Sequence, residues 1–141
     1  MSARDLYHAN IKNALIKDGW TITDDPLRLR WAQGEKDMYV DLGADKLLTA
    51  EKAKRKIAVE VKSFVGRSQI RDLQQAVGQY ILYLDVLSQV EPDRELYLAI
   101  HEEVFDDLFE EPIGQLLLEK QRLKLIVFNR HAEVILEWLP K

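Results

Sequence analysis

Apolar residues recur at helical spacing in two segments of the chain. Near the start, Ser2 and Asp5 have the pattern of a helix N-cap with an acidic first turn, and Gly19 is placed to end that helix. From about Ser68 to Ser88, two apolar faces run along a second predicted helix. The first face contains Ile70, Leu73, Val77, Ile81 and Leu84, and the second contains Ala76, Tyr80, Tyr83 and Leu87. Two apolar faces predict a helix that is covered on two sides.

Short extended runs fill much of the remaining chain, at residues 20–23, 27–31, 39–51, 57–64, 95–100, 123–128 and 133–139. The polar run Lys52–Lys56 separates two apolar runs and predicts the tip of a β-hairpin. Glu102 to about Arg122 is predicted to be helical, with a break at Pro112. The order of helix, strands, helix, strand, helix and strands predicts one α/β domain over residues 1–141, with a mixed sheet flanked by helices.

Composition narrows the class of protein. With 141 residues, 47% hydrophobic and 31% charged, the chain has the make-up of a soluble globular domain. No apolar run approaches the roughly 18 residues of a membrane span, and the first residues lack a secretory pattern, so we expect a cytoplasmic protein without membrane contact. There is no cysteine, and the three histidines lack the spacing of zinc ligands. A metal would therefore be oxygen-ligated, such as Mg²⁺ or Mn²⁺.

The formal net charge of −4 argues against strong unaided binding to DNA. It leaves room for a local basic groove, because lysines and arginines gather at Lys52–Lys56 and again at Lys62, Arg67 and Arg71. The alternative for the Lys52–Lys56 run is a solvated face.

Glu60 and Lys62 are the first candidates for chemistry. Residues two apart on a strand share a face, so Val59 and Val61 would enter one core layer while Glu60 and Lys62 occupy the other. Charged groups on such an apolar strand are costly unless they are paired, solvated in a cleft or bound to a metal. The alternative interpretation is an ion pair on an edge strand.

Asp45 is predicted to complete the site. A hairpin tip near Ala53 and Lys54 would set Asp45 opposite Lys62, so that Asp45, Glu60 and Lys62 converge. Two neighbouring carboxylates favour a divalent cation, with the Val61 carbonyl as a third ligand. Such an ion activates water and neutralises charge on a phosphate, while Lys62 would orient or deprotonate the water or stabilise the phosphate. Asp41 is the second choice for the acidic position.

The helix that follows supplies further polar groups. Asp72, Gln75 and Gln79 form one stripe at spacings of three and four, and Tyr83 lies one turn beyond Gln79. Gln79 and Tyr83 could orient a bound water or a phosphate. The alternative is a solvent-exposed polar stripe. On the first helix, His8 and Asp5 are within possible reach of the site, although a surface histidine is the favoured interpretation of His8.

The motifs together resemble the XisH proteins, the fdxN-element excision controlling factors of cyanobacteria. The resemblance is carried by four segments in order: YHANIKNALIKDGWTITDDP (7–26), DLGAD (41–45), AVEVKSF (58–64) and DLQQAVGQYILYL (72–84). XisH-like proteins are placed in the PD-(D/E)xK nuclease superfamily, which implies a restriction-endonuclease-like core and an Mg²⁺- or Mn²⁺-dependent endonuclease acting on DNA.

The resemblance also implies roles for individual residues. The proline-aspartate motif would fall on Ala44 and Asp45, and the (D/E)xK triplet on Glu60, Val61 and Lys62. The glutamine-tyrosine helix motif would fall on Gln79 and Tyr83, with Gln75 nearby. Alanine at position 44 departs from the pattern, and the acid that many relatives carry on the first helix has no clear match.

Two functional hypotheses remain open. The leading one is an active metal-dependent endonuclease in DNA excision or recombination, working beside an XisI-like partner and a site-specific recombinase, as the resemblance implies. The rival is a non-catalytic accessory that binds DNA or protein and regulates the recombinase. The sequence leaves self-association open. No Gly-rich phosphate loop and no serine-histidine nucleophile signature supports a small-molecule enzyme.

Overall fold

The computed structural model describes residues 6–31, 37–48 and 53–141. Its helical elements are α1 (His8–Lys17), α2 (Gln69–Val90), α3 (Glu102–Val104), a π-helical segment (Phe105–Phe109) and α4 (Pro112–Glu119). Its strands are β1 (Thr21–Asp24), β2 (Leu27–Leu29), β3 (Met38–Val40), β4 (Leu42–Leu47), β5 (Lys54–Val61), β6 (Arg94–His101), β7 (Leu125–Asn129) and β8 (Val134–Leu139).

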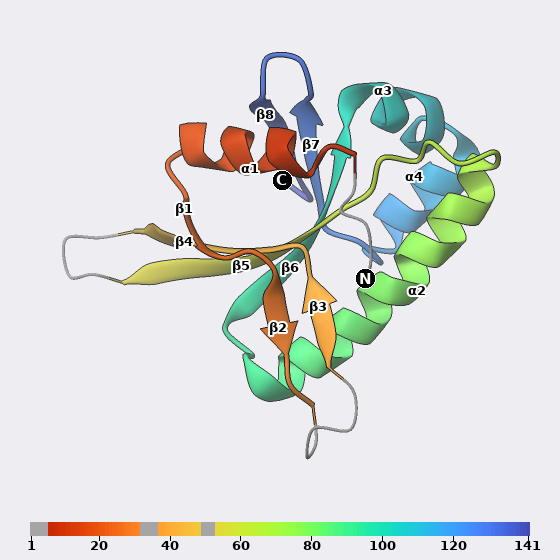
Figure 1. Ribbon diagram of the computed structural model, residues 1–141. Coiled ribbons are helices and arrows are strands. Elements are labelled where there is room, and N and C mark those ends of the chain that lie inside the picture. Colours follow the sequence, from red (N-terminus) through yellow and green to blue (C-terminus); the bar gives the residue numbers. More distant parts are fainter. Residues whose placement is uncertain (1–5, 32–36, 49–52) are drawn as a thin grey trace.

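Six strands form one mixed sheet in the order β1-β4-β5-β6-β7-β8, and β2 pairs with β3 in a separate ribbon. The central pairs β5–β6 and β6–β7 are parallel, and the outer pairs are antiparallel. Parallel neighbours require a crossover, and α2 provides it between β5 and β6. The predicted mixed sheet flanked by helices is confirmed, and it is consistent with a nuclease-like α/β fold (Figure 1).

Helices cover both faces of the sheet because the central strands are apolar on both sides. On β5, Ile57, Val59 and Val61 pack in the cluster that contains α1, whereas Ala58 packs in the cluster that contains α2. This alternation is the period of two that a strand requires. Glu60 therefore lies on the face of the sheet that α2 covers.

The α2 helix begins where its sequence predicts. The Ser68 hydroxyl accepts a hydrogen bond from the Arg71 backbone amide at 3.3 Å and so caps the helix. The helix is covered on one side only, which corrects the expectation of two covered faces. Leu73, Tyr80 and Leu87 are buried, whereas Ile70, Ile81 and Leu84 of the first predicted face remain exposed. No helix within the described ranges is long and apolar enough to cross a bilayer.

Three other expectations need adjustment. The run 39–51 is divided at Asp41 into β3 and β4, which belong to different sheets. The basic residues Lys54–Lys56 lie inside β5 and do not form the hairpin tip. The segment 102–122 contains three short helical pieces, and Pro112 starts the last of them at a position where its missing N–H costs nothing. The predicted N-cap at Ser2 and Asp5 lies outside the described residues.

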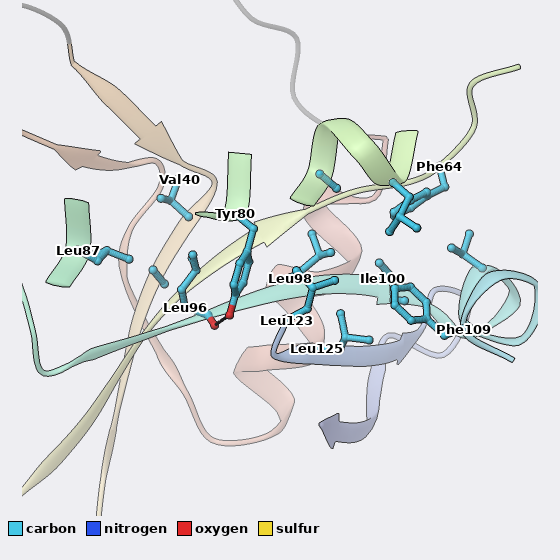
Figure 2. Packing of buried hydrophobic residues seen from close by; sticks show 14 of the residues in the cluster. Val40, Phe64, Tyr80, Leu87, Leu96, Leu98, Ile100, Phe109, Leu123 and Leu125 are labelled. Atoms are coloured by element: carbon cyan, nitrogen blue, oxygen red, sulfur yellow. Dashed lines mark hydrogen bonds between the residues drawn. The ribbon is translucent and has the colours of Figure 1, made fainter. Parts of the chain in front are cut away.

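Tyr80 ties α2 to the sheet by a hydrogen-bonded bridge through its hydroxyl. The hydroxyl donates to the Leu96 carbonyl at 2.8 Å and accepts from the Lys124 amide at 3.1 Å. Figure 2 shows the ring standing among buried leucines with the bond to Leu96 drawn. Burial raises the pKa of the Tyr80 hydroxyl to about 12, so the group stays protonated at neutral pH.

Tyr80→Phe is expected to lower the free energy of unfolding by about 1–3 kcal/mol, because two backbone groups lose their partner inside the core. Urea denaturation measures the change. Tyr39→Phe is the matched control, since the Tyr39 side chain is half exposed, and should stay within about 0.5 kcal/mol of wild type. An equal effect of both substitutions would contradict the bridging role of Tyr80.

Candidate active site

The end of β5 presents Glu60 and Lys62 to one face of the sheet, as the strand period predicts. The Lys62 backbone amide donates to the Ala99 carbonyl at 3.1 Å, which continues the parallel pairing with β6 one residue beyond the strand. The Lys62 ammonium lies 3.9 Å from a Glu60 carboxylate oxygen. Because β5 is the third of six strands, the pair is central in the sheet, and the alternative of an edge-strand ion pair is excluded.

Asp45 does not join this pair. The β4–β5 register sets Asp45 opposite Lys56, six residues before Lys62 along the strand. The Asp45 carboxylate lies 3.5 Å from the Lys54 ammonium. The expectation that Asp45 stands opposite Lys62 is therefore wrong, and the geometry gives Asp45 no contact with Glu60 or Lys62.

The physical reason lies in Arg55, which behaves as a strand residue in spite of its charge. Its guanidinium stands over three aromatic rings, those of Trp20, Tyr97 and Trp138, at 5.5 to 5.8 Å from their centroids. It also donates to Glu95 at 3.0 Å. These contacts draw Lys54–Lys56 into β5, so the strand begins within the basic run and Asp45 pairs with Lys56 and not with Lys62.

Asp41 occupies the position that the sequence predicts for Asp45. It lies just before β4, whose first residue Leu42 pairs with Val59, so Asp41 falls beside Glu60. The Asp41 backbone amide donates to a Glu60 carboxylate oxygen at 3.2 Å. The Val61 backbone amide donates to the Asp41 carboxylate at 2.8 Å. The second-choice acid is thus the one that the fold brings to the Glu60–Lys62 pair.

Burial and like charge make Glu60 an unusual carboxylate. Its side chain is only 6% exposed. Burial, with a further contribution from the neighbouring Asp41 carboxylate, raises the pKa of Glu60 to about 8, although the Lys62 ammonium partly opposes the change. Two acids held side by side in a poorly solvated position are characteristic of a functional site.

Tyr83 approaches the acidic pair from α2. Its side chain is half-buried, and burial together with the negative charges of Glu60 and Asp41 raises the pKa of its hydroxyl to about 12. The tyrosine that the sequence selected therefore lies within electrostatic reach of both carboxylates. Gln79, one turn earlier, has an exposed side chain. A role for Gln79 in the site stays a prediction.

A pocket of about 160 Å³ adjoins Lys62. It is lined by Lys62, Ser63, Phe64, Val65, Gly66, Asp72 and Gln75. Gln75 therefore lines the same pocket as Lys62, and its role in the site stays a prediction. Asp72 accepts from the Gly66 amide at 3.0 Å and so fixes the loop between β5 and α2.

The site suits a metal of the magnesium type in its donor set. Within the described ranges, histidines, aspartates and glutamates form no group of three that could hold a metal ion. Asp41 and Glu60 supply two carboxylates, and Mg²⁺ commonly takes one or two from a protein and fills its remaining positions with water and substrate phosphate. The Val61 carbonyl stays a predicted ligand.

His8 is not the surface histidine that the helix pattern favoured. Its side chain is buried, and its Nε2 lies 2.8 Å from an Asp25 carboxylate oxygen. Lys12 donates to the other oxygen of Asp25 at 2.7 Å. Sequence reasoning missed Asp25, because an aspartate before a proline in a turn signal gives no indication of a buried partner. Asp5 lies outside the described residues.

A mixed α/β sheet with Asp41, Glu60 and Lys62 gathered at the end of a central strand is consistent with the nuclease-like class of fold. Comparisons with known proteins identify the family. The family model described as XisH protein matches residues 1–136. No curated protein matches the chain.

Two solved structures are closely similar. One is an XisH family protein from Nostoc punctiforme, with 34% identity, a TM-score of 0.83, and coverage of 95% of this chain and 98% of that one. The other is an fdxN element excision controlling factor protein from Anabaena variabilis, with 37% identity, a TM-score of 0.82, and coverage of 96% and 99%. The chain belongs to the XisH family.

In metal-free protein, the free energy of unfolding is expected to fall as the pH rises from about 4.5 to about 8. Between these pH values the folded chain holds a proton on Glu60 that the unfolded chain releases. The stability that Glu60 contributes is therefore fully present below its ordinary pKa of 4.5 and is lost as the pH rises through its folded-state pKa of about 8. One proton corresponds to at most about 1.4 kcal/mol per pH unit. Glu60→Gln should flatten the profile and exceed wild type in stability at alkaline pH.

Urea denaturation in the presence of a chelator, across this range of pH, provides the measurement. Glu119→Gln changes an exposed glutamate on α4 and serves as the control, with a profile that follows wild type. Parallel profiles for wild type and Glu60→Gln would show that Glu60 is already ionised in the folded chain.

Proposed function

We propose that this XisH family protein is a divalent-metal-dependent DNA endonuclease that acts in the excision of a DNA element. The observation that carries the proposal is the pairing of the buried Glu60 with the partly buried Asp41, beside Lys62 at the end of a central strand. The role in excision is suggested by the Anabaena variabilis relative, an fdxN element excision controlling factor. The expected partners are those that the family resemblance implies, an XisI-like protein and a site-specific recombinase.

The energetic cost of the pair supports a functional role. Glu60 and Asp41 repel each other in a position with little water, and a single ammonium at 3.9 Å compensates only in part. Apolar side chains of similar volume would stabilise the same strand better. A role that needs two carboxylates explains why they are there.

The metal, Mg²⁺ or Mn²⁺, would be held by Asp41 and Glu60 in place of the Asp45 and Glu60 expected from sequence. When bound, such an ion lowers the pKa of water and neutralises charge on a phosphate. The Val61 amide fixes the Asp41 carboxylate, and the Asp41 amide fixes Glu60, so each acid is oriented by the backbone of the other strand.

Lys62 carries the remaining charge in the proposed reaction. Its side chain is 29% exposed, which allows the ammonium to reach a phosphate while staying beside Glu60. There it would stabilise the negative charge that grows on the phosphate as the phosphodiester bond breaks. Tyr83 stays protonated, so its hydroxyl can donate a hydrogen bond toward the same region. Gln75 would contact the substrate through the pocket that it shares with Lys62.

One observation favours a second candidate function. The net charge of −4 gives the chain no overall attraction for DNA. A non-catalytic accessory that binds a recombinase or its DNA complex would have less need of such attraction. This alternative assigns no purpose to the Asp41–Glu60–Lys62 arrangement, which is why the endonuclease is preferred.

Nuclease assays on plasmid, single-stranded and branched DNA with Mg²⁺ or Mn²⁺ test the proposal. Asp41→Asn and Lys62→Ala are each expected to lower the cleavage rate on the order of 100-fold or more. The first removes a carboxylate that would hold the metal, and the second removes the positive charge that would act on the reacting phosphate. Chelation should abolish cleavage by the wild-type protein.

Asp45→Asn is the matched control, since it makes the same chemical change on the same β4 segment at a distance from Lys62. It should retain wild-type activity within about twofold. Loss of activity in Asp45→Asn but not in Asp41→Asn would contradict the site assignment. Equal background cleavage by all four proteins would favour the accessory function.

A further inference from the structure

The outward side of α2 carries an apolar stripe, most of whose side chains are left exposed by the described part of the chain. Ile70 is 46% exposed, Ile81 is 47% exposed and Leu84 is 41% exposed. Val77 lies between them and is partly buried against the core. At 3.6 residues per turn these four side chains fall on one line along the helix, adjacent to the buried face. Figure 1 shows α2 running along one side of the molecule.

The spacing of the stripe is that of a helix–helix seam. Ile70, Val77 and Leu84 are separated by intervals of seven, and Ile81 fills the neighbouring position. Apolar residues every seven positions form the contact line when two helices pack side by side. The stripe covers about 21 Å of the helix axis, since each residue rises about 1.5 Å.

Gly78 lies in the middle of α2, and no contact with the described residues explains it. A glycine inside a helix is unfavourable compared with alanine, because it loses more backbone entropy. A Cβ added at Gly78 would meet nothing within 4 Å, so no packing inside the described residues requires the glycine. Open space beside the centre of the stripe leaves room for side chains that come from outside.

Charged residues flank the stripe in a self-complementary arrangement. Arg71 lies near the start of α2 and Asp85 near its end, both with exposed side chains and on the same flank as Gly78. If two α2 helices pack antiparallel with Val77 at the centre, Ile70 of one copy lies opposite Leu84 of the other. Arg71 of one copy and Asp85 of the other are then offset by about two residues along the helix axis, which is about 3 Å.

We propose that α2 pairs antiparallel with α2 of a second copy of this chain, about a two-fold axis near Val77. The arrangement buries the apolar stripe of both copies and forms the Arg71–Asp85 ion pair twice, because a two-fold interface repeats every contact. A second copy is favoured over another partner because both charges that the pairing requires are present on one helix. The inference is independent of the proposed nuclease activity.

The pairing leaves the candidate active site open. Gln75 and Tyr83 lie on α2 away from the stripe, toward Lys62 and the acidic pair. The sites of the two copies would be related by the same axis, each with its own Asp41, Glu60 and Lys62.

Sedimentation equilibrium of the full chain, over protein concentrations from about 1 to several hundred micromolar, tests the pairing. Wild type should show a concentration-dependent dimer. Arg71→Asp or Asp85→Arg replaces two attractive contacts with two repulsive ones, so each should raise the dissociation constant about five- to tenfold at low salt. The double variant Arg71→Asp/Asp85→Arg restores opposite charges and should return to within about twofold of wild type.

Arg122→Asp is the matched control, since it reverses an exposed arginine outside α2 and should leave the dissociation constant unchanged. Gly78→Tyr should keep the fold, because a Cβ at this exposed position meets nothing within 4 Å, and should weaken the dimer by obstructing the second copy. Circular dichroism verifies folding of each variant. A wild-type monomer at the highest concentration would overturn the proposal, and so would a dimer that ignores both charge reversals.

Discussion

The candidate site depends on holding two mutually repelling carboxylates side by side at the end of a buried strand. Asp41 lies just before β4 and Glu60 lies on the neighbouring β5, and each is held by a backbone amide of the other's segment. That arrangement needs a fixed β4–β5 register, a parallel β6 that continues past Val61, and a helix that limits water on the Glu60 side of the sheet. The fold provides all three by placing β5 centrally and crossing over it with α2.

The part of the site that lies on one strand could be predicted from sequence, and the part that depends on two strands could not. Glu60 and Lys62 share a face because of the strand period alone. The position of Asp41 beside Glu60 depends on the β4–β5 register. Arg55 makes this register hard to predict, because its charge indicates a turn although its guanidinium packs over aromatic rings. A run of lysine and arginine does not reveal whether its stems are buried.

Contacts between segments distant in the sequence are equally hard to predict for the helices. The two apolar faces of α2 were both visible in the sequence, yet periodicity does not say what covers a face. The sheet buries Leu73, Tyr80 and Leu87, and leaves Ile70, Ile81 and Leu84 exposed. His8 shows the reverse case, in which a polar residue at a helix start is buried because Asp25, distant in sequence, lies beside it.

The aromatic group around Arg55 has a consequence for spectroscopy. Two of the three tryptophans, Trp20 and Trp138, lie with their rings 5.6 Å apart in this group, while Trp31 is exposed. Arg55 is five residues from Glu60 along β5, a distance of about 17 Å. Intrinsic fluorescence will therefore be dominated by the hairpin end of the sheet, and an optical signal for events at the carboxylates requires a tryptophan introduced near Tyr83.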